Sequence, residues 1–122
     1  MRKEKVSICL VLFCLTVSSC GFKQGCDDAV RESREASLRH MLKELRDVIN
    51  QYALDNNALP QALDDLVKAG YINELPDDPI TEKKDWNPVM GEKVNLKKPK
   101  GIVDVRSSST AKSSKGNPYS EW

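Results

Sequence analysis

The sequence predicts an α+β fold, with a long helix in the first half and short strands in the second. Three observations predict it. An apolar stripe of helical period runs through residues 38–52, and a proline and a glycine bracket a second helical segment at residues 60–70. Short runs with β-branched residues follow residue 86. The 103 residues after residue 19 are enough for one small domain.

The first twenty residues have the pattern of an export signal. Basic residues within 2–5 precede an apolar run at 6–17, and Ser19 and Cys20 then match the cleavage box of bacterial lipoproteins. We therefore expect a lipoprotein-type signal peptide at 1–19, cleaved between Ser19 and Cys20, with the Cys20 thiol carrying the lipid. The alternative is an uncleaved membrane helix, because the seventeen residues 6–22 are uncharged, at the lower edge of what spans a bilayer.

Charge and cysteine content exclude several classes of function. Without residues 1–19 the chain has sixteen basic and seventeen acidic residues, and this near-neutral balance argues against nucleic acid as a partner. Cys26 would be the only thiol left, so it closes no internal disulfide. His40 is the only histidine, so no zinc set can be assembled, and we expect neither a metal nor a cofactor.

The first helix is expected to have two halves. Residues 20–28 are predicted as a tether, and the helix is predicted to begin near Asp27 and end near Asn56. Residues 29–37 carry charges nearly all round, which predicts a polar stalk with Glu35 paired to Arg39 four residues on. The stripe that follows is predicted to pack in the core, chiefly through Leu38, Leu42, Leu45, Ile49 and Tyr52, together with Met41 and Val48.

The second half is predicted as a short helix, a rigid turn and weak strands. The helix follows Pro60, ends at Gly70, and should bury Ala62, Leu63, Leu66 and Val67. Prolines at 76 and 79 predict the turn, and strands are expected at 86–90, 94–96 and 102–105. Residues 107–115 are a Ser/Lys-rich loop, and the aromatic residues Tyr119 and Trp122 are expected to fix the terminus to the fold.

Nothing in the sequence indicates catalysis. The chain has no glycine-rich phosphate loop, and His40 is best explained as a surface partner of Glu44. The serines gather in the 107–115 loop, where no histidine is available to activate them. The acidic pair Asp77-Asp78 does not supply the six or more oxygens of a calcium cage. We therefore predict a protein that is not an enzyme.

An Asn-rich helix stop at 55–57 is followed by Pro60, the Gly70-Tyr71-Ile72 run and the Leu75-Pro76 and Asp78-Pro79 pairs. In these features residues 31–79 resemble the globular part of type II secretion pseudopilins, above all the major, G-type branch, and of type IV pilin-like proteins, and the resemblance extends to residues 101–107 and 116–122. The resemblance implies a long helix packed on a short helix and a small antiparallel sheet, and a domain of 29–122. At the start, Gly21-Phe22 leads into Lys23-Gln24 where the family has an apolar helix.

Together these features predict a pseudopilin-like domain on a lipid anchor. We expect a non-enzymatic accessory or structural component of a type II secretion or type IV pilus-like system, whose partners are proteins of that machinery. We expect it to be exported and to face the periplasm or cell surface, and Gly21 after the anchor cysteine favours the outer membrane. The alternatives are a filament subunit with an uncleaved membrane helix and a free-standing lipoprotein that binds a ligand.

Overall fold

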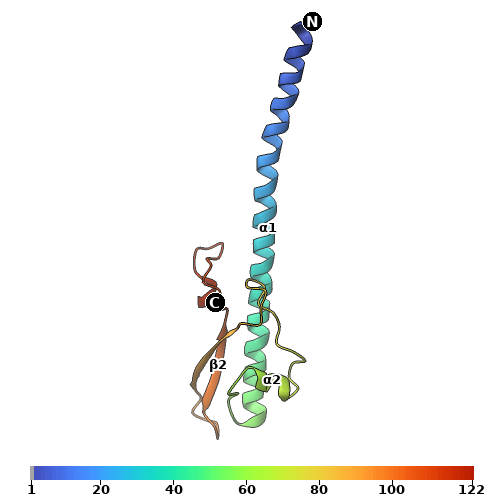
Figure 1. Cartoon of the computed structure of the whole chain (residues 1–122). Helices are drawn as coiled ribbons and strands as arrows, with labels where there is room; N and C mark the ends of the chain where they lie inside the picture. Colours follow the sequence, from blue (N-terminus) through green and yellow to red (C-terminus); the bar gives the residue numbers. More distant parts are fainter. Residues whose placement is uncertain (1) are drawn as a thin grey trace. The chain divides into compact units, whose positions relative to one another are not determined.

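The predicted α+β class is confirmed. In the computed structural model, the backbone is described for residues 2–122 and the side chains for residues 25–122. One long helix is followed by a short helix and a two-stranded antiparallel sheet (Figure 1). The elements are α1 (Arg2–Asn56), α2 (Asp64–Lys68), β1 (Asn87–Glu92), β2 (Lys100–Arg106) and the 3-10 turn η1 (Tyr119–Glu121).

The chain divides into two units, Met1–Ser33 and Arg34–Trp122. In the first unit, the Arg31 guanidinium lies 3.2 Å from the Asp28 carboxylate, and both side chains are exposed.

The helix α1 begins earlier than the sequence predicts. Helical backbone is already present from Arg2, so the prediction that the helix begins near Asp27 is wrong. No proline interrupts residues 2–56, and an interior glycine costs a helix only about 1 kcal/mol. Within residues 25–122, no helix has the length and apolar character needed to cross a membrane.

The core of the second unit lies between α1 and the segments that pack on it. Leu38, Leu42, Leu45 and Ile49 are buried on α1, while Tyr52 is half-buried at the edge of the same cluster. Opposite them the cluster is completed by Leu63, Leu66, Trp86, Ile102, Val105 and Tyr119. The helical period of the stripe explains this face, since residues three and four apart share one side of a helix.

The sheet is a hairpin of β1 and β2. Asn87 pairs with Arg106 at one end and Glu92 with Lys100 at the other, with a bulge between Val89 and Met90. Residues 94–96, predicted as a strand, instead form the turn of this hairpin. Val94 is 93% exposed there, so its β-branched side chain finds no sheet surface to pack on.

The end of α1 is fastened to the sheet. Asn57 adopts a left-handed backbone with φ 52°, as a helix stop requires. The chain then passes so close to β2 that a Cβ on Gly101 would lie 2.7 Å from the Pro60 carbonyl oxygen. That carbonyl accepts a hydrogen bond from the Ile102 N–H at 2.8 Å, which fixes β2 beside the α1 terminus.

The short helix α2 follows this crossing. Leu66 is fully buried and Leu63 is 9% exposed, but Ala62, predicted to be buried, is exposed. The reason is that Ala62 precedes α2, where the Asp65 carboxylate accepts hydrogen bonds from the Gln61 and Ala62 N–H groups. The helix ends before Gly70, whose φ of 82° suits glycine.

Candidate functional site: the Glu35 clasp

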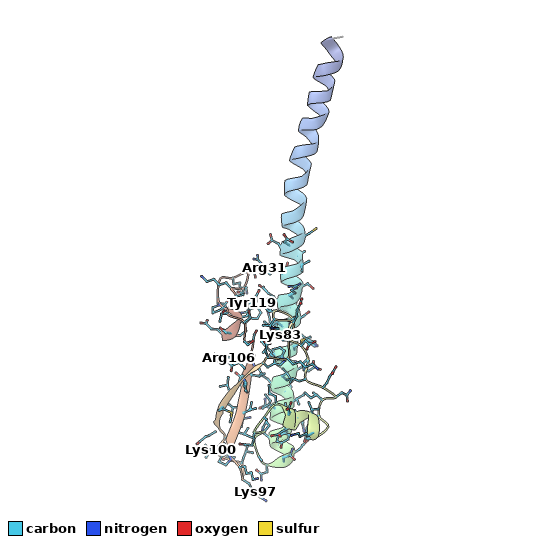
Figure 2. All side chains as sticks on the ribbon, in the orientation of Figure 1. Arg31, Lys83, Lys97, Lys100, Arg106 and Tyr119 are labelled. Atoms are coloured by element: carbon cyan, nitrogen blue, oxygen red, sulfur yellow. The ribbon has the colours of Figure 1, made fainter. Side chains whose placement is uncertain are left out.

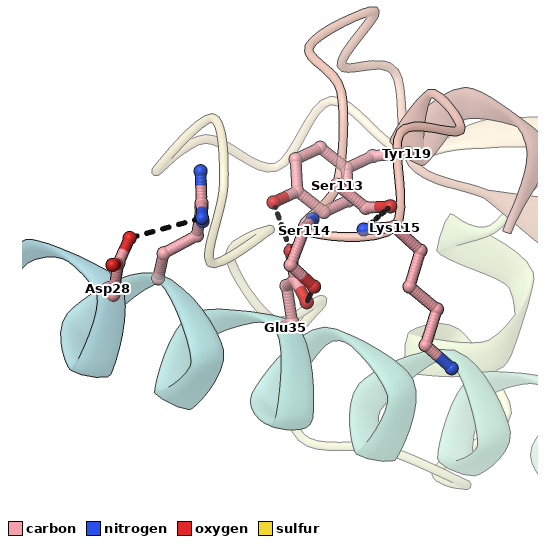
Figure 3. Close-up of polar contacts among 7 residues, drawn as sticks. Asp28, Glu35, Ser113, Ser114, Lys115 and Tyr119 are labelled. Atoms are coloured by element: carbon pink, nitrogen blue, oxygen red, sulfur yellow. Dashed lines mark hydrogen bonds and ion pairs between the residues drawn. The ribbon is translucent and has the colours of Figure 1, made fainter.

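A buried carboxylate on α1 holds the last part of the chain. Glu35 is 1% exposed, and its two oxygens accept three hydrogen bonds (Figure 3). Ser114 donates its backbone N–H to Oε1 at 2.6 Å and its hydroxyl to Oε2 at 2.7 Å. The Tyr119 hydroxyl donates to Oε1 at 2.9 Å. We call Glu35, Ser114 and Tyr119 the Glu35 clasp.

The loop that carries Ser114 is shaped by its own hydrogen bonds. Ser113 bonds twice to Asn117, from its backbone N–H to the carbonyl at 2.8 Å and from its hydroxyl to the side-chain oxygen at 2.6 Å. The Tyr119 N–H donates to the Ala111 carbonyl at 3.0 Å, which closes the loop at its base. These contacts fix the loop that presents the Ser114 N–H and hydroxyl to Glu35.

The clasp favours the ionised form of Glu35. Burial acts to raise the pKa of this carboxyl, but the hydrogen bonds from Ser114 and Tyr119 outweigh it, together with the Arg39 charge. The pKa is therefore held below its usual value of 4.5. Arg39 lies 3.7 Å from Oε2, and its guanidinium also stacks 5.0 Å from the centre of the Trp122 ring.

A second buried carboxylate organises the turn before β1. Asp78 is fully buried, and its Oδ2 accepts a hydrogen bond from the Ser107 hydroxyl at 2.5 Å. Its Oδ1 accepts from the Ile80 N–H at 2.7 Å. The indole N–H of Trp86 donates to the Pro76 carbonyl at 2.7 Å. Asp78 therefore joins the proline-rich turn to the start of the serine-rich loop.

This arrangement corrects the predicted polar stalk. Glu35 was assigned to the solvated part of the helix, yet it is as buried as the core leucines. A charge can be buried there because every oxygen of the carboxylate has donors, which offsets the loss of water. Arg34 beside it remains half-exposed and lies 3.6 Å from Glu82. In the second unit the packed part of α1 thus begins one turn before Leu38.

The hydrogen-bonding groups of the clasp are satisfied within it. All its donors are committed to one carboxylate, and no buried side-chain nitrogen or oxygen within the described part of the chain lacks a hydrogen-bond partner. Among residues 25–122, no group of three or more His, Cys, Asp or Glu is placed to hold a metal ion. His40 and Glu44 are both exposed on α1, away from the core face.

The residues predicted for lipidation and signal cleavage, Cys20 and Ser19, lie outside the residues whose side chains are described. Cys26 is a free, exposed thiol. Sequence reasoning missed Glu35, Ser114 and Asp78 as organising residues. A signal was present for Glu35, because it lies three residues before Leu38 and so shares the stripe's face.

No protein-family model matches the chain, and no curated protein and no solved structure matches it either.

Proposed function

We propose that this protein is a non-enzymatic, pseudopilin-like lipoprotein that serves as a structural or accessory component of a type II secretion or type IV pilus-like machine. The observation that carries the proposal is the architecture of residues 34–122, in which α1 packs on α2 and an antiparallel hairpin. That layout is the one implied by the resemblance of residues 31–79 to pseudopilins.

The anchoring part of the proposal places the protein on a membrane through lipid on Cys20, facing the periplasm or the cell surface. Acyl chains contribute roughly 0.8 kcal/mol per buried methylene, and one chain alone holds only marginally, so stable attachment takes several. Cys20→Ala should abolish incorporation of labelled fatty acid and leave a precursor of higher mass. A native protein without a lipid adduct, or with its amino terminus at Met1 or Phe22, contradicts this anchoring.

The partner part of the proposal is tested through Cys26, an exposed thiol near the start of the region whose side chains are described. A thiol-specific photocrosslinker on Cys26 should capture proteins of the secretion or pilus machinery in cells. The Cys26→Ser protein is the matched control and should capture none of them. Crosslinks confined to proteins outside such a machine would instead favour the free-standing lipoprotein.

One observation favours a second candidate, a filament subunit with an uncleaved amino-terminal helix. Helical backbone runs from Arg2, as such a subunit requires. Against this candidate, the helix carries exposed charges at Arg31, Glu32 and Arg34. Packing these side chains in the core of a fibre would remove their water at a large cost in free energy. We therefore expect the purified domain 21–122 to stay soluble and unpolymerised. Recovery of the protein as a stoichiometric component of sheared filaments would support the filament subunit instead.

A further inference from the structure

Lysines concentrate at the loop that joins β1 to β2. Four lie within residues 93–100, and Figure 2 shows Lys97 and Lys100 at this end of the hairpin. The chain as a whole carries a net charge of only +1, so the concentration is local. We call this surface the basic end, and it comprises Lys93, Val94, Lys97, Lys98, Lys100 and the neighbouring Leu54.

The backbone of the basic end is held in place. The N–H groups of Lys97 and Lys98 both donate to the Asn57 carbonyl, at 3.0 and 3.3 Å. The Leu59 N–H donates to the Lys98 carbonyl at 3.2 Å. Because the loop is tied to the end of α1, its lysines are presented from a fixed backbone, and binding a partner would cost little ordering.

The lysine charges at the basic end are poorly neutralised. Lys100 lies 3.5 Å from Glu92, but both side chains are mostly exposed, and such pairs contribute little. Lys93 donates to the neutral Asn50 side chain at 2.6 Å. Lys97 and Lys98 are exposed, and within the described residues neither has a carboxylate within 4.0 Å.

The loop and the end of α1 that holds it each carry an exposed apolar side chain. Val94 is 93% exposed and Leu54 is 75% exposed. The Lys93–Asn50 contact brings the start of the loop to the last turns of α1, and Leu54 follows Asn50 by one turn on the same helix face. A surface hollow at the same loop is lined by Gln61, Lys97, Lys98, Pro99 and Lys100.

We infer that the basic end is a docking surface for an acidic, extended protein segment. Carboxylates of the segment pair with Lys97 and Lys98, and its apolar side chains pack against Leu54 and Val94. Charge complementarity identifies the occupant as acidic, and the hollow beside Pro99 receives a side chain. A flat anionic membrane would use the lysines but leave the hollow empty. The inference does not depend on the proposed secretion role.

The test measures binding of a short fluorescent peptide of Asp, Glu and Leu to the full-length protein in non-ionic detergent, by anisotropy. A peptide with Asn and Gln in place of the acids is the control ligand and should not bind. Lys97→Glu/Lys98→Glu should weaken binding of the acidic peptide by about tenfold or more. Lys43→Glu/Lys68→Glu changes the net charge equally on exposed helix positions and should shift the Kd by less than about twofold.

Three further results would support or overturn the proposed docking surface. Val94→Ser keeps every charge and should weaken binding by about threefold, since it removes apolar contact area. Equal weakening by both charge-reversal pairs, with unchanged thermal midpoints, would overturn the inference in favour of non-specific attraction. Binding to phosphatidylglycerol vesicles that is lost in Lys97→Glu/Lys98→Glu, without peptide binding, would overturn it in favour of a lipid surface.

Discussion

Glu35 and Ser114 are 79 residues apart in the sequence, yet the two Ser114 donors meet both oxygens of the Glu35 carboxylate, at 2.6 and 2.7 Å. Tyr119 adds a third donor from the turn η1. The last segment of the chain is therefore joined to α1 by charge-assisted hydrogen bonds as well as by apolar packing. This relationship makes the stability of the domain sensitive to one carboxylate.

Glu35→Gln should lower the free energy of unfolding by about 1–3 kcal/mol, because the amide loses the charge and turns a donor towards the donors of Ser114. Tyr119→Phe should cost about 1.5–3 kcal/mol through the lost hydrogen bond to a charged group. Glu44→Gln, exposed on the same helix, is the control and should stay within about 0.5 kcal/mol. Chemical denaturation measures all three, and equal midpoints for the Glu35 and Glu44 variants would refute the role of the clasp.

The same carboxylate predicts a pH dependence. Because the folded state holds the pKa of Glu35 below 4.5, the ionised form stabilises the fold above that pH, and the stabilisation is lost as the pH falls through the folded pKa. The stability difference between the natural protein and Glu35→Gln should be constant at neutral pH and shrink below about pH 4.5. Urea midpoints across this range give the difference. A gap that persists unchanged in acid would show that the Glu35 charge does not contribute.

Packing of the apolar stripe of α1 predicts that substitutions at two positions change the free energy of unfolding by very different amounts. Leu45 is 2% exposed at the centre of the core, so Leu45→Ala should cost about 2–5 kcal/mol. Ser33 is exposed, and Ser33→Ala should be nearly neutral. Thermal or urea unfolding compares them directly. Similar midpoints would mean that the helix does not pack through this face.

Two glycines of the hairpin should respond differently to alanine. On Gly101 the added Cβ would lie 2.6 Å from the Leu59 Cβ and 2.7 Å from the Pro60 oxygen. On Gly91 its three nearest atoms would all belong to the Val103 side chain, with the methyl carbons at 2.7 and 3.1 Å, and this side chain can rotate away. Gly101→Ala should therefore be the more destabilising of the two, by about 1–3 kcal/mol. The prediction fails if Gly91→Ala has the lower unfolding midpoint.

The elements set by local chemistry could be predicted from the sequence. The period of the apolar residues places Leu38, Leu42 and Leu45 on one face of a helix, and the stops at Asn57 and Gly70 follow from the left-handed backbone those residues tolerate. Tyr119 was expected to fix the terminus to the fold, and it lies in the core at 3% exposure.

What the sequence could not supply were the contacts made by polar residues across long separations. Ser114 is an exposed residue of a Ser/Lys-rich stretch that resembles solvated loop, and only the distant, buried Glu35 gives it a structural role. The strand predicted at 94–96 is wrong for a related reason, because valine favours strands but Val94 lies where the chain reverses. Tertiary context overrides local propensity at both places.

The separation of Glu35 from its donors has a consequence for how the domain forms. A contact that closes so long a stretch of chain costs loop-closure entropy and slows folding. The hydrogen bonds to Glu35 also cannot form until residues 114–119 have been synthesised. Glu35 on α1 therefore remains solvated while the intervening chain is made. Proteolysis that removes residues 114–122 would return the folded protein to that incomplete state, with a hydrated Glu35 carboxylate on an open core.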